Sequence, residues 1–216
     1  MKTSFVILLS WILIGHIGPA VAGEGNKGDG KGEAHLEKAT FAGGCFWCMQ
    51  PPYDKLKGVV STTVGYTGGT KPKPTYEEVC AGKTGHAEAV EIAYDPARVG
   101  YSELLDVFWK NINPTTLNQQ FADAGTQYRT AIFYHNEEQK RLAVASKEKV
   151  EKSGKFDRPI VTEIVPASTF YPAEETHQAY YKKCPLPYQF YKTGSGREGY
   201  LKKVWGKARG TTREGR

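Results

Sequence analysis

Residues 41–48, Phe-Ala-Gly-Gly-Cys-Phe-Trp-Cys, combine two thiols and two large aromatic side chains with a pair of glycines. A short apolar run over 39–42 leads into the glycines, which allow a sharp turn, and polar, helix-forming residues follow over 48–57. This order predicts a strand, a tight turn and a helix. Cys45 would lie at or just before the helix N-terminus, where free N–H groups and the helix dipole favour a thiolate. We therefore expect the pKa of Cys45 to be lowered.

Four cysteines, at positions 45, 48, 80 and 184, could be structural bridges, metal ligands or redox groups. A structural zinc site usually needs a second close Cys or His pair, and Cys80 with His86 does not supply a standard one. A disulfide between Cys45 and Cys48 would remove little entropy from the unfolded chain, because only two residues separate them. We interpret that pair as a reversible redox couple, and Cys80 and Cys184 as small thiols that are buried or partly exposed. No metal site is expected.

The residues between the two thiols, Phe46 and Trp47, are bulky and apolar. They could form a small hydrophobic pocket beside the thiolate, suited to an apolar group such as a methyl. The simpler alternative is that one ring packs in the core. A general Cys-x-x-Cys disulfide oxidoreductase is a second possible function, although the order of elements does not give the thioredoxin pattern cleanly. A third is an exported metal- or ligand-binding module with static thiols.

The first 22 residues have the pattern of a secretory signal: Lys2, an apolar run over 5–17, and Ala-Val-Ala at 20–22. We expect cleavage after Ala22, which would place the mature chain outside the cytoplasm, in the periplasm or secreted. The alternative is an uncleaved membrane anchor, but an apolar run of about 13 residues is shorter than the ~20 that a spanning helix needs.

Residues 23–36 are predicted to form a flexible linker, because glycine and charge dominate them and nothing apolar occurs before residue 34. One folded domain is expected over 37–206, followed by a basic tail over 207–216. The formal net charge is +6. Many basic residues follow position 182, among them Lys192, Arg197 and Lys202. We interpret them as a solvated surface, because no nucleic-acid motif accompanies them.

Strands and helices alternate along the predicted domain. We expect strands over 59–66, 87–94, 128–134 and 160–165, a helical turn over 76–80, a helix capped by Ser102, and helices over 137–153 and 173–183. Residues 113–127 contain proline, asparagine and glycine without periodicity, so a long ordered loop is expected there. Several connections are too short for parallel crossovers. The prediction is an α/β two-layer sandwich, a mixed β-sheet with helices packed on it.

Six motifs occur in order: Gly-Gly-Cys-Phe-Trp-Cys at 43–48, Tyr-Thr-Gly-Gly at 66–69, Thr-Tyr-Glu-Glu-Val-Cys at 75–80, Gly-His-Ala-Glu at 85–88, Gly-Thr-Gln-Tyr-Arg at 125–129 and His-Gln at 177–178. In these six motifs the sequence resembles the type A peptide-methionine sulfoxide reductases. The resemblance extends from about residue 38 to residue 205. The resemblance implies that the Cys45 thiolate attacks the sulfoxide sulfur. It also implies that Glu88 is the general acid, which requires an apolar pocket that raises its pKa.

The same resemblance assigns further site residues. Tyr76 and Tyr128 match tyrosines that hydrogen-bond the sulfoxide oxygen, and Asp123 matches a carboxylate that helps to hold the substrate backbone or an ordered water. Phe46 and Trp47 match the wall that receives the methionine methyl and, by analogy, selects the S epimer. The substrate is methionine sulfoxide, free or in oxidised proteins.

The sequence departs from much of this family at the resolving thiol. Many relatives have glycine where this chain has Cys48 and carry resolving cysteines in a C-terminal tail, but no cysteine follows Cys184 here. We expect Cys48 to condense with the Cys45 sulfenic acid, with Cys184 as the alternative. A thioredoxin-like dithiol would then reduce the disulfide. No bound metal, flavin or nicotinamide is implied, and the chain is expected to act as a monomer without stable membrane insertion.

Overall fold

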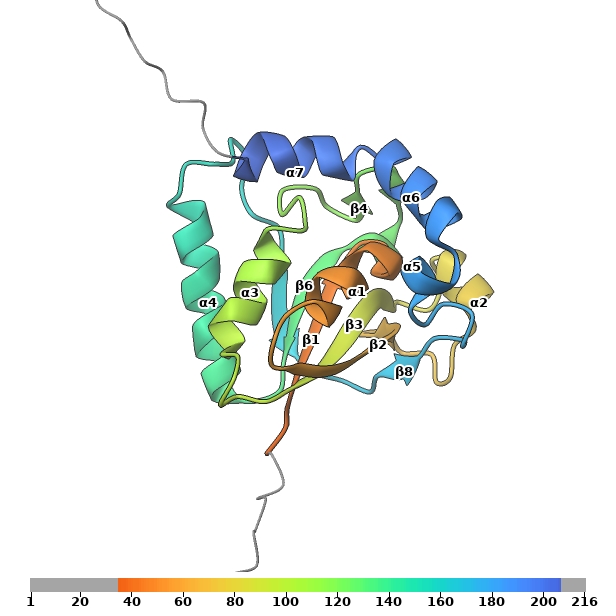
Figure 1. Ribbon diagram of the computed structural model, residues 1–216, viewed down its shortest axis with the longest axis horizontal. Coiled ribbons are helices and arrows are strands. Elements are labelled where there is room, and N and C mark those ends of the chain that lie inside the picture. Colours follow the sequence, from red (N-terminus) through yellow and green to blue (C-terminus); the bar gives the residue numbers. More distant parts are fainter. Residues whose placement is uncertain (1–34, 207–216) are drawn as a thin grey trace, which may run out of the picture. The chain divides into compact units, whose positions relative to one another are not determined.

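A mixed six-stranded sheet forms the centre of the fold, with its strands in the order β7–β6–β1–β3–β2–β8 (Figure 1). The computed structural model describes residues 35–206, so the expected signal at 1–22, nearly all of the expected linker and the expected tail at 207–216 lie outside the described residues. Within the described range, no helix has both the length and the apolar character needed to cross a membrane. The strands are β1 Glu37–Gly43, β2 Val59–Thr67, β3 Ala87–Tyr94, β6 Thr130–Tyr134, β7 Glu163–Pro166 and β8 Tyr171–Pro172.

Only one strand pairing in this sheet is parallel. β6 and β7 run parallel and are joined through a long helix, whereas the other neighbouring strands are antiparallel. The mixed sheet is therefore as predicted. The strands expected at 59–66 and 87–94 are correct to within one residue. Those expected at 128–134 and 160–165 begin too early, because residues Thr126–Tyr128 form the 3-10 helix η1 and β7 starts only at Glu163.

The main helices cover one face of the sheet. The helices are α1 Phe46–Asp54, α2 Tyr76–Cys80, α3 Tyr101–Trp109, α4 Glu137–Glu151, α5 Tyr180–Lys183, α6 Pro185–Gly194 and α7 Arg197–Trp205. On the covered face Phe41 of β1 stacks on Tyr53 of α1 at 5.7 Å and on Phe108 of α3 at 5.3 Å. The next residue, Ala42, faces the other way and packs in a cluster with Phe170. The architecture is therefore the predicted two-layer sandwich.

Two helix boundaries differ from the sequence prediction. α3 begins after Gly100 and not after Ser102, because the carboxylate of Glu103 accepts the Gly100 N–H at 3.0 Å and so closes the first turn two residues earlier. α4 ends at Glu151, where the expected helix continued to 153. Shifts of one or two residues at helix ends leave the rest of both helices where they were predicted.

The expected helix over 173–183 is largely wrong. Only Tyr180–Lys183, the short α5, is helical, and Ala179 before it has a φ of 50°. The Gln178 amide donates to the Val64 carbonyl oxygen at 2.8 Å and accepts the Val64 N–H at 3.0 Å. Gln178 thus bonds to the edge of β2 as a strand would, and this tertiary contact prevents the preceding residues from coiling.

The long loop over 113–127 is ordered, as expected. It contains a small hairpin of β4 Gln119–Gln120 and β5 Asp123–Ala124. The buried Gln120 amide accepts the Asn113 N–H at 2.9 Å and donates to the Asn113 carbonyl oxygen at 2.6 Å. A buried amide with these partners holds the hairpin against the rest of the domain.

The basic segment after residue 182 is not simply a solvated surface. It forms α6 and α7, and Arg197 is only 2% exposed. Its guanidinium donates to the carbonyl oxygens of Gly43 at 3.2 Å and Asn111 at 2.5 Å and lies 4.5 Å from the centre of the Phe121 ring. Arg197 therefore ties α7 to the end of β1 and to the loop after α3. The expectation of a solvated Arg197 was wrong, because charge counting cannot reveal buried carbonyl partners.

Candidate active site

A tight turn between β1 and α1 positions Cys45. Gly44 has a φ of 80°, and a Cβ atom there would come within 2.4 Å of the Gln120 side chain, so only glycine fits. Cys45 is the N-cap of α1, as the sequence predicted, and its carbonyl oxygen accepts the Cys48 N–H at 3.1 Å. Both thiols are buried, with 6% of Cys45 and 3% of Cys48 exposed.

The pKa of Cys45 is raised, which contradicts the expected lowering. Burial is the main cause, and a hydrogen bond to Cys48 and the nearby Glu88 act in the same direction. The loss of water is thus the largest influence on the pKa of this thiol. The pKa of Cys48 is lowered instead, first by the hydrogen bond that its sulfur accepts from Cys45 and further by the positive charge of Arg197.

Glu88 faces the same turn from the beginning of β3. It is 2% exposed, and its carboxyl group accepts the Phe46 N–H at 3.0 Å. Burial raises the pKa of Glu88 to about 8, with Asp123 and Cys48 contributing in the same direction. Its carboxyl group is consequently protonated at neutral pH, in the buried pocket expected from the sequence.

One small cavity of about 60 Å³ brings nearly all the predicted site residues together. Its lining residues are Cys45, Phe46, Trp47, Tyr76, Glu88, Asp123, Tyr128 and Tyr191. Cys48 is the one predicted residue that does not line it. Burial raises the pKa values of Tyr76 and Tyr128, so both phenols stay protonated and able to donate hydrogen bonds. The cavity is about large enough for a sulfoxide group and its methyl.

The sequence did not identify Tyr191, which α6 brings into this cavity. Its hydroxyl group donates to the carboxylate of Asp123, and its proximity to the Cys45 sulfur acts to lower the pKa of that thiol. The ring meets Trp47 edge-on, with ring centroids 5.9 Å apart. With 13 tyrosines in the chain, composition could not single it out. Pro185 at the start of a run of helix-compatible residues was the available signal for α6.

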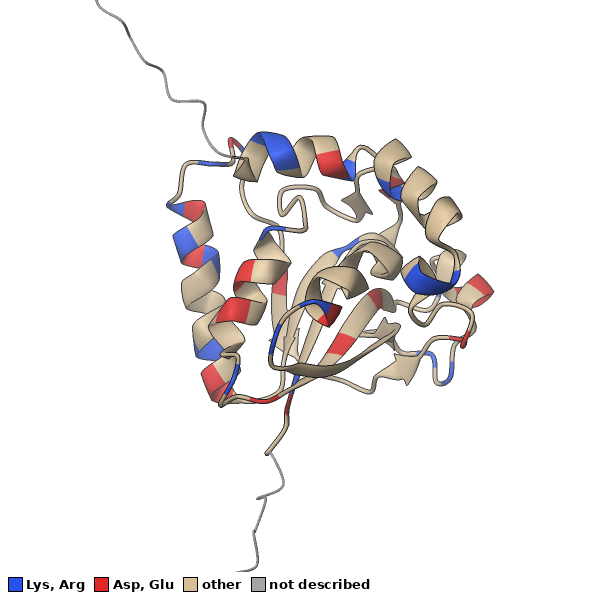
Figure 2. Ribbon diagram, in the orientation of Figure 1, with Lys and Arg blue, Asp and Glu red and all other residues tan. Residues whose placement is uncertain are grey.

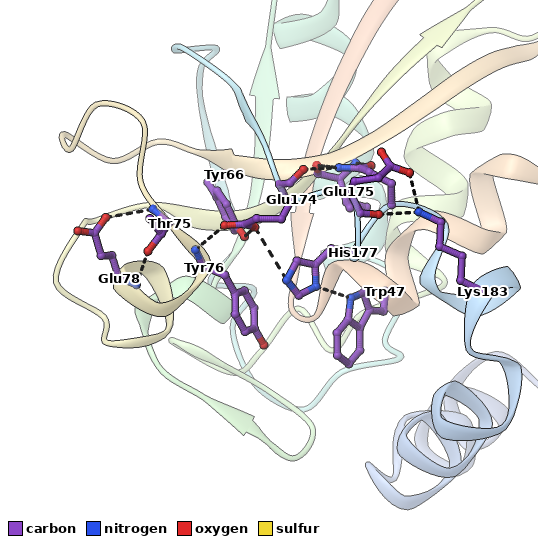
Figure 3. A network of polar contacts seen from close by, with 12 residues as sticks. Trp47, Tyr66, Thr75, Tyr76, Glu78, Glu174, Glu175, His177 and Lys183 are labelled. Atoms are coloured by element: carbon purple, nitrogen blue, oxygen red, sulfur yellow. Dashed lines mark hydrogen bonds and ion pairs between the residues drawn. The ribbon is translucent and has the colours of Figure 1, made fainter.

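A polar network behind the cavity fixes the Trp47 ring (Figure 3). The indole N–H donates to His177 Nδ1 at 3.1 Å, and the ring stacks on Tyr180 with centroids 3.9 Å apart. Burial lowers the pKa of His177, which keeps the imidazole neutral so that Nδ1 can accept. Glu174 accepts the Tyr66 hydroxyl at 2.8 Å and the Tyr76 N–H at 2.9 Å. The network thus connects one wall of the cavity to another.

The two remaining cysteines lie outside the cavity. Cys80 ends α2 and Cys184 precedes α6, and both are partly exposed. Within residues 35–206 no cluster of three or more Cys, His, Asp or Glu side chains could hold a metal ion.

A buried thiol pair beside a protonated carboxyl and several phenols, on a mixed-sheet α/β domain, defines the class of thiol-dependent reductases. Comparison with known proteins identifies the family within this class. Residues 37–209 match the model of the family described as peptide methionine sulfoxide reductase. The chain belongs to this family.

Individual relatives agree with this assignment. The protein named peptide methionine sulfoxide reductase MsrA from Bacillus subtilis is 55% identical, and the alignment covers 79% of this chain and 96% of the relative. The protein of the same name from Bacillus licheniformis is 54% identical, and the alignment covers 79% of this chain and 94% of the relative. Among solved structures, Mxr1 from Saccharomyces cerevisiae in reduced form is 36% identical with a TM-score of 0.66, covering 70% of this chain and 87% of that one. Methionine sulfoxide reductase A of Corynebacterium diphtheriae is 35% identical with a TM-score of 0.64, covering 72% and 78%.

Proposed function

We propose that this chain reduces methionine S-sulfoxide, free or in oxidised proteins, to methionine, with Cys45 as the nucleophile. The observation that carries the proposal is the cavity of about 60 Å³ into which the Cys45 thiol and the protonated Glu88 carboxyl both face. The chemistry needs a sulfur nucleophile and a proton donor on one small substrate group, and the cavity offers both. The names of the family and of the relatives agree with this reaction.

In the first step the Cys45 sulfur attacks the sulfoxide sulfur while Glu88 donates its proton to the sulfoxide oxygen. The attack forms a sulfur–sulfur bond between Cys45 and the substrate. The protonated oxygen then forms a bond to the Cys45 sulfur, the sulfur–oxygen and sulfur–sulfur bonds to the substrate sulfur break, and methionine leaves. Cys45 is thereby oxidised to a sulfenic acid and the sulfoxide is reduced. Because the pKa of Cys45 is raised at rest, its thiolate forms only once the polar sulfoxide group is bound beside it.

The other cavity residues bind and orient the substrate. Tyr76 and Tyr128 donate hydrogen bonds to the sulfoxide oxygen, where negative charge increases during the attack. Asp123 holds the substrate backbone or an ordered water. Phe46 and Trp47 receive the methyl group, and the fixed Trp47 ring makes the cavity selective for the S epimer.

In the second step Cys48 attacks the sulfenic acid sulfur of Cys45. A sulfur–sulfur bond forms, the sulfur–oxygen bond breaks, and the oxygen leaves as water. Cys48 suits this role because its pKa is lowered and because it lies in the first turn of the helix that Cys45 caps. A thioredoxin-like dithiol then reduces the disulfide, so no prosthetic group is needed.

We also propose that residues 37–206 are the catalytic domain and that the chain is exported, with cleavage after Ala22, a linker over 23–36 and a basic tail over 207–216. The support is the charged, apolar and small-residue order of the first 22 residues. N-terminal sequencing of the protein isolated from its own cells tests the proposed cleavage. A protein that retains residue 2 would contradict it.

Thiol titration without a reductant tests the chemistry. With methionine sulfoxide in excess, the wild-type protein should release one methionine and lose two thiols per chain. Cys45→Ser should do neither, and Cys48→Ser should release one methionine but form no intramolecular disulfide. Cys184→Ser is the matched control and should behave as wild type. Turnover by Cys45→Ser would overturn the proposal, and a Cys45–Cys184 disulfide in the mass spectrum would overturn the role of Cys48.

A further inference from the structure

α6 has an exposed apolar face. Its Leu186 and Phe190 are 72% and 79% exposed, which makes them the two most exposed large apolar side chains among residues 35–206. They are four residues apart, so they lie one turn apart on the same side of the helix. Together with Gln189 and Thr193 they line a hollow of about 230 Å³. We call these four residues the α6 patch.

α6 is also nearly free of charge. Lys192 is the only charged residue in this helix, and Figure 2 shows the contrast with α4 and α7, which carry several charges each. Single exposed apolar side chains are common on soluble proteins, but an apolar pair beside a hollow on an uncharged helix is typical of a surface that binds another protein. Such surfaces are enriched in aromatic residues, as Phe190 is.

Another side of α6 covers the two thiols. Tyr188 lines a cavity of about 550 Å³ that also contains Cys48, and we call it the Cys48 cavity. Tyr191 lines the substrate cavity with Cys45. Gln189 lines both the Cys48 cavity and the hollow of the α6 patch. The patch is therefore continuous with the cavity that contains the second thiol.

We propose that the α6 patch is the docking surface for the thioredoxin-like protein that reduces the Cys45–Cys48 disulfide. The inference rests on the proposed function, which creates this disulfide and needs a protein dithiol to reduce it. A partner seated on the patch lies next to the Cys48 cavity, so its reactive thiol enters there. No residue lines both this cavity and the substrate cavity, and the partner therefore reaches Cys48 and not Cys45.

The size of the α6 patch favours a transient partner over a second copy of this chain. Stable complexes bury about 1,600 Å² in total and permanent homodimers more, whereas weak redox complexes bury less than about 1,200 Å². Two exposed apolar side chains can anchor only a small interface. A reductant has to leave after each turnover, and a small interface allows that.

The Cys48 cavity suits the reactive part of a dithiol protein. Its volume of about 550 Å³ lies within the ~300–1,000 Å³ typical of ligand sites, so it has room for a cysteine and its neighbours. An attacking thiol reacts as the thiolate, which nearby positive charges stabilise. The cavity is lined by four cations and one carboxylate: Lys55, Lys192, Arg197, Lys202 and Glu198.

Reduction then follows thiol–disulfide exchange. The partner's thiolate attacks the Cys48 sulfur, the bond between Cys48 and Cys45 breaks, and Cys45 leaves as a thiolate that takes up a proton. The partner's second thiol loses its proton and attacks the partner's own sulfur in the mixed disulfide, which releases Cys48 as a thiolate. The enzyme disulfide gains two electrons, and the partner's dithiol becomes a disulfide.

Turnover with two reductants tests the α6 patch. Leu186→Ala with Phe190→Ala removes both apolar anchors, and the fold should persist because these side chains are exposed. The reductants are a purified thioredoxin, kept reduced by its reductase, and dithiothreitol. At saturating methionine sulfoxide, the variant's kcat/KM for thioredoxin should fall at least about tenfold, because aromatic anchors dominate the binding energy of protein interfaces. Its kcat/KM for dithiothreitol should equal that of the wild type.

Leu117→Ala with Val144→Ala is the matched control. Both side chains are exposed and line neither the two cavities nor the hollow of the patch. This double variant should keep wild-type values with both reductants. Unchanged thioredoxin kinetics in the α6 variant, an equal loss with both reductants, or an equal effect of the control would overturn the proposal.

Trapping shows which thiol the partner reaches. A thioredoxin variant that lacks its second cysteine should remain linked to the oxidised enzyme through Cys48, which peptide mapping by mass spectrometry identifies. A link through Cys45 or Cys184 would overturn docking on this side.

The remaining outcomes separate this inference from its alternatives. A wild-type dimer that Leu186→Ala with Phe190→Ala dissociates, measured by light scattering, would assign the patch to a second copy of the chain and overturn the proposal. Wild-type turnover with dithiothreitol but not with thioredoxin would overturn this inference and leave sulfoxide reduction standing. Turnover with neither reductant would overturn the proposed function as well.

Discussion

Glu88 illustrates two opposing effects on one carboxyl group. The Phe46 N–H at the start of α1 and the positive end of the helix favour the ionised form, whereas burial favours the neutral form. Burial wins, since the pKa of Glu88 is raised to about 8. A neutral carboxyl at physiological pH is what proton donation to the sulfoxide oxygen requires.

We therefore expect Glu88→Gln to lower kcat by about 10²- to 10⁴-fold, because glutamine keeps the shape of the side chain but has no acidic proton. In the wild type, kcat should fall as the pH rises through about 8, where Glu88 loses its proton. The pH dependence of kcat at saturating sulfoxide measures both effects. Glu91→Gln on the same strand is the control and should keep wild-type kcat. Full activity of Glu88→Gln would exclude Glu88 as the acid.

Tyr191→Phe should lower kcat roughly tenfold or more, because its hydroxyl group donates to the charged carboxylate of Asp123 in the cavity that Cys45 lines. Hydrogen bonds to charged groups contribute about 1.5–3 kcal/mol, which corresponds to that range of rates. Tyr134→Phe, at the end of β6 and outside the cavity, is the control and should have no effect. Steady-state kinetics measure kcat for the wild type and both variants. Equal kcat values for the two variants would show that the Tyr191 hydroxyl is dispensable.

At the scale of helices and strands, the sequence predicted those elements whose formation depends mainly on local residue patterns. The alternation in β3 and the polar helix α4 were found where expected. The bonding of Gln178 to β2 and the burial of Arg197 depend on partners more than 80 residues away in sequence, and no periodicity encodes them. For the same reason, the family resemblance supplied the residues of the cavity but not Tyr191, which only the packing of α6 brings there.

The β1–α1 turn should be intolerant of any side chain at Gly44. A Cβ atom there would lie 2.4 Å from Gln120, and the φ of 80° is unfavourable for alanine. Gly44→Ala should lower the free energy of unfolding by more than about 1 kcal/mol. Gly194→Ala is the control, because no atom lies within 4 Å of its added Cβ in α6, and it should be neutral or stabilising. Urea denaturation measures the stability of both variants. Equal unfolding midpoints for Gly44→Ala and Gly194→Ala would contradict the tight turn.

The connection of α7 to the turn depends on Arg197. Arg197→Met removes the donors to two carbonyl oxygens, so it should lower the free energy of unfolding by about 2–4 kcal/mol. Arg141→Met, on exposed α4, removes an ion pair with Glu138 and should change it by less than about 1 kcal/mol. Urea denaturation at constant pH measures both. A stable Arg197→Met would mean that α7 is held without this residue.

For the whole molecule, the candidate active site is where segments distant in sequence meet. Cys45 comes from the β1–α1 turn, Glu88 from β3, Asp123 from the loop hairpin and Tyr191 from α6. The turn, the hairpin and the C-terminal helices must all be in place before Glu88 is enclosed. The protonation of Glu88 is consequently coupled to the folding of the entire domain.

This coupling predicts how stability changes with pH. The ordinary pKa of Glu88 is 4.5, and the folded value is about 8. Between those values the unfolded chain loses the proton while the folded chain keeps it, so the contribution of Glu88 to stability is present at low pH. It is lost as the pH rises toward 8, by about 1 kcal/mol per pH unit. The Glu88→Gln side chain cannot ionise, so the variant lacks this pH dependence. The difference in free energy of unfolding, wild type minus variant, should therefore fall between pH 4.5 and about 8 and level off at higher pH. Urea titrations of both proteins from pH 4 to 9 measure the difference, and a constant difference would show that Glu88 is ionised in the folded protein.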